Sequence, residues 1–193
     1  KGKDTRMIQD YVFGYGSLAN ASTHDFLAPS PARLSGWRRY WCQIEATDHA
    51  FLSIRRSEGD IIDGLLARVE PQQWPGLDAR EAGYDRLSSV AAIYTGDHAD
   101  HETACAVYAV PPITSPTRPC DVPILRSYLD VVLQGYLTVF GLDGAKRFMA
   151  STDWNCAVLD DRAAPLYPRH QHISAAENSA ITALLHSFQL TLL

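Results

Sequence analysis

The first part of the chain alternates short apolar runs with polar turns, a pattern typical of strands. A run from Tyr11 to Gly14 is followed by stretches at 34–46, 50–56 and 61–69 that are rich in β-branched, aromatic or aliphatic residues. The polar sequence at 57–60 separates two of these stretches and predicts a turn. Together they predict an antiparallel meander.

Helical signals are weak in the first half of the chain and stronger after about residue 124. Residues 22–27 are compatible with a brief helix before the next prolines, and residues 71–82 predict a short helix that carries Glu81 near its end. The stretches 84–94 and 104–110 then predict a hairpin across Gly96 and Asp97.

The clearest helix is expected at 124–140, where apolar residues fall on one helical stripe. Before it, residues 111–123 hold five prolines, which exclude a regular helix or a central strand and indicate a stiff connector. Strands that precede helices in this way predict an α+β domain.

Composition limits the possible classes of protein. With 193 residues, of which 46% are hydrophobic, the chain predicts a single domain over 1–193. The net charge of −5 argues against a nucleic-acid partner, and no apolar run approaches the roughly 20 residues that cross a bilayer. We therefore expect a cytoplasmic protein with no membrane partner, as a monomer or homodimer. The C-terminal residues 181–193 fit either the core or a contact with a second copy.

The sequence VFGYGSL at 12–18 is the most informative stretch. Glycines at 14 and 16 would allow positive φ and a close approach to a ligand, so backbone N–H groups can face an oxygen anion. Gly14, Gly16 and Ala19 also match a dinucleotide-binding pattern, but strands and prolines follow instead of a long helix. Ser17 lacks the flanking glycines of a nucleophile elbow. The alternative interpretation of this loop is purely structural: a tight turn that ends a strand.

A second stretch, LDAREAGYDR at 77–86, places Glu81 among arginines and aspartates. A partly buried carboxylate with a raised pKa can carry a proton between reacting groups. Taken alone, Glu81 is better explained as a solvated residue at a helix end than as an acid–base catalyst, because charge clusters are common there.

Together these two stretches resemble the gamma-glutamylcyclotransferase family, which in bacteria typically carries an FGYGSL loop and a later REAGY segment. Two further patches fit, at 127–129 with Gly135 and at 160–169. The resemblance spans Tyr11 to Arg169, and residues 1–6 and 170–193 lie outside it. It implies a small, mostly antiparallel, closed or nearly closed β-sheet with flanking helices.

The resemblance also implies an enzyme that converts a γ-glutamyl amino acid or γ-glutamyl amine to 5-oxoproline and the free amine, without a cofactor. Glu81 would be the catalytic general acid and base. The small-molecule substrate would be bound by Tyr15, Gly16, Ser17, Leu18 and Tyr128. Ala19, Asn20 and Ala21 depart from the aromatic and basic residues of the glutathione-specific branch. A non-catalytic binding protein for a small acidic metabolite is the alternative, because a fold does not guarantee its chemistry.

Two groups of side chains have metal-ligand chemistry, and the cysteines must also be considered. His98 and His101 accompany Asp97 and Asp100, and His170 lies two residues from His172. Both groups are expected in exposed turns or the tail, so we predict no metal site. The four cysteines lack close paired spacing, and we expect partly buried, reduced thiols.

Overall fold

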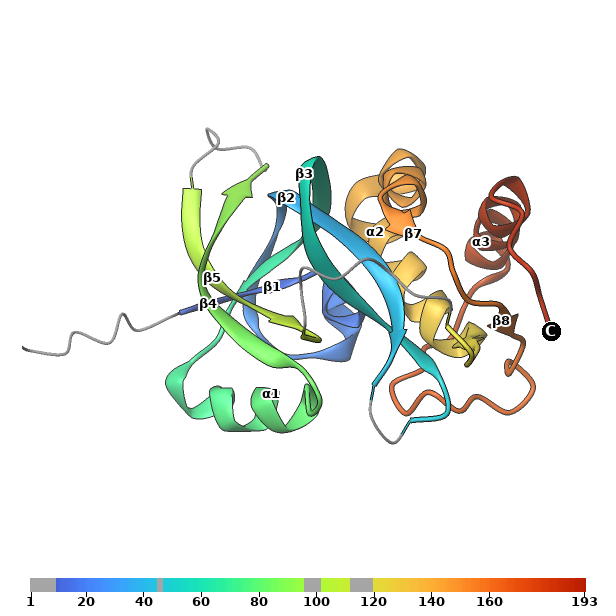
Figure 1. The fold of residues 1–193 in the computed structure, drawn as a ribbon, viewed down its shortest axis with the longest axis horizontal. Coiled ribbons are helices and arrows are strands. Elements are labelled where there is room, and N and C mark those ends of the chain that lie inside the picture. Colours follow the sequence, from blue (N-terminus) through green and yellow to red (C-terminus); the bar gives the residue numbers. More distant parts are fainter. Residues whose placement is uncertain (1–9, 45–46, 96–101, 112–119) are drawn as a thin grey trace, which may run out of the picture.

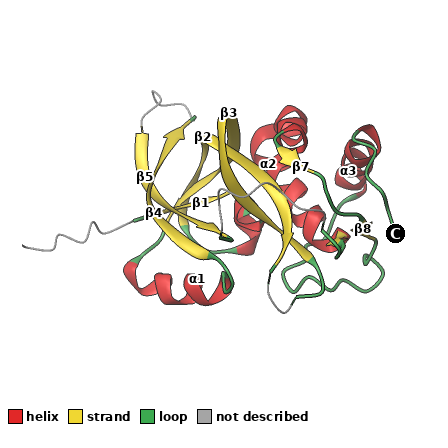
Figure 2. Cartoon of the chain, in the orientation of Figure 1, coloured by secondary structure: helices red, strands yellow, loops and turns green. Residues whose placement is uncertain are grey.

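The computed structural model describes residues 10–44, 47–95, 102–111 and 120–193, and its centre is a five-stranded barrel. The strands are β1 (Tyr11–Gly14), β2 (Leu27–Gln43), β3 (Ala50–Arg68), β4 (Asp85–Tyr94) and β5 (Glu102–Ala109). Their order is β2-β4-β5-β1-β3, and β3 pairs again with β2, which closes the ring (Figures 1 and 2). The predicted α+β fold with a closed, mostly antiparallel sheet is confirmed.

The long β2–β3 ribbon corrects the expected division of this region into short strands. Ser35 pairs with Ile61 whereas Trp37 pairs with Arg56, so residues 57–60 bulge out of one continuous strand. Gly36 and Gly59 have φ values of 78° and 82°, which glycine adopts at little steric cost. The predicted turn at 57–60 is therefore a bend within β3 and does not end it.

The short helix predicted at 71–82 is confirmed, but it ends at Arg80, so Glu81 lies just after it and not within it. It consists of a 3₁₀ turn at Pro71–Gln73 followed by α1 (Trp74–Arg80). Its start is fixed by a capping box in which Glu70 and Gln73 exchange side-chain-to-backbone hydrogen bonds. No helix spans 22–27, where the expectation was wrong. Two 3₁₀ turns occupy Ser17–Ala19 and Ala21–Thr23 instead, and β2 already begins at Leu27.

The main helix, α2 (Arg126–Ala150), is longer than expected. Gly141 has a φ of 64° and kinks it immediately after the expected end at residue 140. Ile124 and Leu125 form a short strand, β6 (Ile124–Leu125), rather than the first turn of the helix. The carboxylate of Asp161 accepts hydrogen bonds from the Ser127 backbone N–H (2.8 Å) and hydroxyl (2.5 Å), and so caps α2 from a distant segment.

The C-terminal part completes the core. Strands β7 (Thr152–Asp153) and β8 (Val158–Leu159) pair in parallel with β2 and β6, and α3 (Ala175–Ser187) packs on α2. Ile181, Leu184 and Leu185 are buried in the main hydrophobic cluster. The C-terminal segment, for which the sequence allowed two roles, thus contributes to the core of its own chain.

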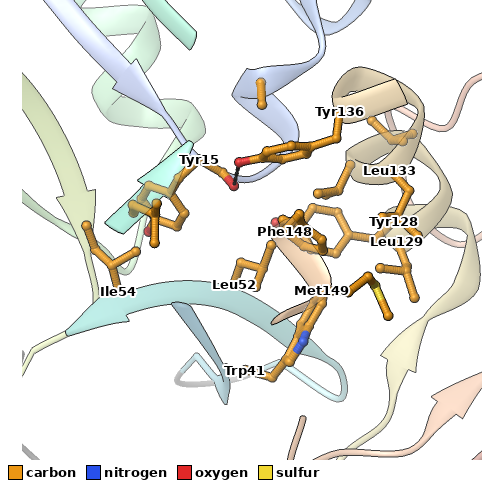
Figure 3. Packing of buried hydrophobic residues seen from close by; sticks show 14 of the residues in the cluster. Tyr15, Trp41, Leu52, Ile54, Tyr128, Leu129, Leu133, Tyr136, Phe148 and Met149 are labelled. Atoms are coloured by element: carbon orange, nitrogen blue, oxygen red, sulfur yellow. Dashed lines mark hydrogen bonds between the residues drawn. The ribbon is translucent and has the colours of Figure 1, made fainter. Parts of the chain in front are cut away.

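The main hydrophobic cluster lies between the barrel wall and α2. Trp41 and Leu52 extend from β2 and β3 toward side chains of α2 such as Leu129 (Figure 3). Ile54 of β3 lies farther from α2, on the side of Tyr15. A smaller cluster lies under α1 and contains Leu18, Leu77, Tyr108 and other residues of β1 and β3. The loop after β1 is therefore held between two apolar layers.

All four thiols are free, with Cys105 buried and the other three partly buried. Strands β4 and β5 form the expected antiparallel pair. Residues 96–101, where a turn with His98 and His101 was predicted, and most of the predicted proline connector lie outside the described residues. Within the described part of the chain, no helix is both long enough and apolar enough to span a membrane.

The close packing after β1 yields a prediction for two glycines. A Cβ on Gly14 would lie 2.5 Å from the Leu18 Cβ, whereas a Cβ on Gly76 in α1 meets nothing within 4 Å. We expect Gly14→Ala to lower the free energy of unfolding by about 1–3 kcal/mol because the core cannot expand. Gly76→Ala, the control, should stabilise by about 0.5–1 kcal/mol through helix propensity. Urea unfolding of both variants measures these changes, and equal effects would contradict the packing argument.

Candidate active site

A cavity of about 840 Å³ lies where the end of α1 meets the start of α2 and the segment at 167–169. A smaller niche of about 30 Å³ shares lining residues with it and is lined by the loop at 13–18. Ser17, Glu81, Tyr84 and Tyr128 line both spaces. The two stretches singled out in the sequence therefore meet at one site.

The glycines of this loop serve close packing, and the expectation of positive φ at them is wrong. Gly16 has a φ of −114°, and Gly14 is not among the residues with positive φ. A Cβ at Gly16 would lie 3.0 Å from the Tyr128 hydroxyl oxygen. Because Gly14 and Gly16 have no side chain, the backbone at residue 14 can pack against Leu18 and the backbone at residue 16 against Tyr128.

The loop is anchored from behind by a fully buried arginine. The Arg39 Nε donates to the carbonyl oxygen of Tyr15 (3.2 Å), and the Tyr136 hydroxyl donates to the same oxygen (3.0 Å; Figure 3). The Tyr15 hydroxyl donates to the carbonyl of Tyr108 (2.5 Å). Three distant elements thus fix the backbone orientation of residue 15.

With its carbonyl groups held, the loop keeps backbone donors available. The carbonyls of Gly16 and Ser17 accept hydrogen bonds from Ala19 and Asn20 (2.9 and 3.1 Å). Among the described residues, the N–H groups of Gly16, Ser17 and Leu18 have no protein acceptor. Successive free N–H groups of this kind form an anion-binding cradle.

The side chains of Leu18 and Ser17 already have partners within the protein. The side chain of Leu18 is buried in the small cluster under α1, so only its backbone is available to a ligand. The Ser17 hydroxyl accepts a hydrogen bond from the Arg80 Nη2 (3.2 Å). Among the described residues, the Ser17 hydroxyl donates no hydrogen bond to a basic side chain, so Ser17 is not arranged as a nucleophile.

Glu81 is the residue immediately after α1. Its backbone N–H donates to the Leu77 carbonyl (3.0 Å), and the chain then reverses through Gly83, whose φ is 93°. The carboxyl side chain is only 16% exposed and forms an ion pair with Arg80 (Nε to Oε1, 3.1 Å). Glu81 is therefore not the solvated helix-end residue that its sequence neighbourhood also allowed.

Burial and neighbouring charges have opposite effects on the pKa of Glu81. Burial raises the pKa of Glu81 above its ordinary value, and the charges of Arg80 and Arg169 offset part of that rise. Arg80 also donates to the Thr23 carbonyl (2.8 Å) through Nη1. One guanidinium group therefore joins the carboxyl group to the loop.

Aromatic side chains close the site around Glu81. Tyr128, expected to line the pocket, does so, and its ring makes edge contacts with Phe51 and Tyr167 at centroid distances of 5.3 and 4.9 Å. The Tyr84 hydroxyl donates to the Leu52 carbonyl (2.8 Å). Burial raises the pKa of Tyr128 and Tyr84 well above the ordinary value, so both phenols are neutral donors.

Sequence reasoning assigned no role to several residues of this site. Arg80 and Tyr84 lie within the REAGY segment, and Tyr167 and Arg169 lie within the patch at 160–169. Both stretches carried a recognisable signal, but only the folded chain shows that they surround one cavity. Arg39 gave no signal, because an arginine in a strand normally faces solvent.

The residues considered as metal ligands do not form a metal site where they are described. His170 and His172 line a separate cavity of about 440 Å³ beside α2 and α3. Across the described ranges, no group of three or more histidine, cysteine or acidic side chains has a geometry that would hold a metal ion.

Comparison with known proteins places the chain in a family. The family described as "Gamma-glutamyl cyclotransferase, AIG2-like" matches residues 12–126, and the chain belongs to it. A solved structure described as "Gamma-glutamyl cyclotransferase" is 15% identical, with a TM-score of 0.59, over 90% of this chain and 98% of that chain.

An uncharacterized protein from Homo sapiens gives a TM-score of 0.59 at 16% identity, over the same shares of the two chains. YkqA from Bacillus subtilis gives 0.56 at 17% identity, over 73% of this chain and 53% of that chain. A search of curated proteins gives no significant match. The structural likenesses show a shared fold, and membership of the family supports a gamma-glutamylcyclotransferase-like function.

The surroundings of Glu81 predict its titration. In a carboxyl titration followed by NMR, with Glu81→Gln used to assign the signal, the Glu81 midpoint should lie above the ordinary 4.5. Arg80→Gln should raise the midpoint further, because it removes a cation that favours the carboxylate. The control Arg86→Gln removes a cation paired with Asp78 and should leave Glu81 unchanged. A midpoint at or below 4.5 would contradict this account.

Proposed function

We propose that the protein is a gamma-glutamylcyclotransferase that forms 5-oxoproline from a γ-glutamyl amino acid or γ-glutamyl amine. The α-amine of the substrate would attack its own γ-carbonyl, and the amide nitrogen would leave as a free amine. The observation that carries the proposal is the meeting of a buried carboxyl group, Glu81, with a cradle of free N–H groups at one niche. Family membership supports the same reaction.

Substrate folding supplies a large part of the rate in this scheme. Because attacking amine and carbonyl belong to one molecule, holding them in near-attack geometry contributes about 7 kcal/mol or more. The closely packed rings of Phe51, Tyr128 and Tyr167 give the cavity the rigid walls that such positioning needs. No covalent intermediate on the protein is required.

Glu81 would handle the proton. As the carboxylate it accepts a proton from the attacking amine, and as the acid it returns that proton to the leaving nitrogen. The raised pKa of Glu81 favours both duties. It brings the pKa closer to the working pH, so the group can both accept and return a proton.

The loop would stabilise developing negative charge. The N–H groups of Gly16, Ser17 and Leu18 face no protein acceptor among the described residues, which suits them to a substrate carboxylate or a carbonyl oxyanion. Each such donor contributes about 3 kcal/mol in comparable sites. The anchors behind Tyr15 keep these donors oriented before the substrate arrives.

The direct test is detection of 5-oxoproline by mass spectrometry. The protein is incubated with γ-glutamyl amino acids, γ-glutamyl amines and glutathione, and each mixture is examined for product. Formation of 5-oxoproline from at least one compound supports the proposal. Tight binding without product would instead favour a binding protein for a small acidic metabolite.

Removal of the proton carrier gives the first variant. Glu81→Gln should lower kcat by about 10²- to 10⁴-fold, the usual contribution of general acid–base catalysis. Folding should survive, because a carboxyl group with a raised pKa costs stability as pH rises through the interval above its ordinary value. The melting temperature at pH 7 should therefore not fall. Glu58→Gln, at an exposed glutamate of the β3 bulge, is the matched control.

Obstruction of the cradle gives the second variant. Gly16→Val should abolish turnover, since even a Cβ there comes within 3.0 Å of the Tyr128 hydroxyl oxygen. The smaller change Gly16→Ala should be less severe, and Tyr128→Phe in the same chain should recover part of its substrate binding by removing that oxygen. Unaltered kcat/KM in Gly16→Val would exclude the loop from the reaction.

A further inference from the structure

Arg169 is an exposed cation that lines the main cavity. Its guanidinium forms no hydrogen bond or ion pair with any described residue, although it is close enough to Glu81 to influence that carboxyl group. Arg80, in contrast, is bound to Glu81, Ser17 and Thr23. Arg169 is thus the cavity arginine that remains available to a ligand.

The backbone that carries Arg169 is held on both sides. The Tyr167 N–H donates to the Ser127 hydroxyl oxygen (3.2 Å), and that hydroxyl is itself bound to the α2 cap, Asp161. The His170 N–H donates to the Tyr167 carbonyl (3.0 Å). The backbone beneath the exposed Arg169 side chain is therefore anchored at the edge of the cavity.

The location of Arg169 separates it from the reacting atoms. It lines the main cavity but not the niche, whose lining includes the loop N–H groups and Glu81. The niche has room for about one small polar group. A γ-glutamyl carbonyl bound at the niche would direct the leaving group into the main cavity, where Arg169 is a cation that can meet it.

We propose that Arg169 binds a carboxylate on the leaving group, so that the site prefers γ-glutamyl amino acids or peptides to γ-glutamyl amines. This inference rests on the proposed function. The outer walls include Phe51, Val110 and Pro111, which suit an apolar side chain beside that carboxylate.

The charge balance of the cavity points the same way. The described lining residues carry two guanidinium groups and one carboxyl group, and Arg80 is already paired with Glu81. The remaining positive charge attracts an anionic leaving group and repels the second ammonium of a diamine. Selection between substrates therefore has both an attractive and a repulsive component.

A pair of substrates that differ by one carboxylate tests the inference. γ-Glutamyl-phenylalanine and the γ-glutamyl amide of phenethylamine share the aromatic leaving group, and only the first carries the carboxylate. For the unaltered protein, kcat/KM should favour the acid by about 10-fold or more, the usual value of a hydrogen bond to a charged group. Arg169→Gln should reduce this ratio by a similar factor, and Arg169→Lys should retain part of it.

Controls separate recognition from effects on Glu81. Each variant is assayed on the plateau of its own pH profile, because loss of Arg169 also changes the pKa of Glu81. Lys146→Gln removes an exposed cation on α2 and should leave the acid-to-amide ratio unchanged. Equal losses for both substrates in Arg169→Gln would overturn the inference, since they would place the arginine on the shared γ-glutamyl part.

A binding measurement keeps this test independent of turnover. In the Glu81→Gln background, calorimetry should show tighter binding of the acid than of the amide, and addition of Arg169→Gln should remove that preference. Absence of 5-oxoproline together with a retained preference would contradict the proposed function and support the carboxylate site. Equal affinities for the two compounds would overturn the carboxylate site.

Discussion

The site depends on the contacts that the guanidinium group of Arg80 makes with Glu81 and with residues near the loop. Arg80 lies next to Glu81 in sequence but reaches Ser17 and Thr23, more than 50 residues earlier in the chain. Because Arg has a planar fork of donors, one side chain can satisfy all these acceptors without changing rotamer. Loss of this group would free the carboxyl group and the loop from each other, even if the barrel remained intact.

A second buried cation supports the same loop from the core side. Arg39 is fully buried, and its nitrogen atoms donate to the Tyr15 carbonyl, the Asp63 carbonyl and the Tyr136 and Ser151 hydroxyls. Burial lowers the pKa of Arg39, and the hydroxyl of Tyr136 offsets part of that effect. Such a residue is expensive to bury, and its contacts place the Tyr15 backbone more firmly than apolar packing alone would.

Much of the fold could be predicted from the sequence because its signals are local. The β1 strand, the presence of a short helix near Glu81 and the first half of α2 follow from apolar periodicity and turn residues. The β3 bulge could not be distinguished from a turn, because a bulge and a turn use the same glycine and polar residues. The 3₁₀ turns after β1 depend on contacts with α2 and β3 that no local pattern encodes.

In the candidate site, too, some residues could be predicted from the sequence and others only from the folded chain. Glu81, Tyr128 and the loop were predicted from motif resemblance, and the structure brings them to one niche. Gly14 and Gly16 were identified for the wrong reason, since the distances to Leu18 and Tyr128 arise only in the folded chain. Arg39 and Arg169 could not be predicted, because their importance depends on which neighbours surround them.

The thiols have a practical consequence for experiments on this protein. Burial raises the pKa of Cys42 and Cys105 to about 12 and also raises that of Cys156, so these side chains remain protonated at neutral pH. Since thiolates are the reactive species, alkylating reagents should modify these three positions slowly. None of the four cysteines lines the niche or the main cavity. Inactivation by a sulfhydryl reagent would therefore report damage to packing rather than capture of a nucleophile.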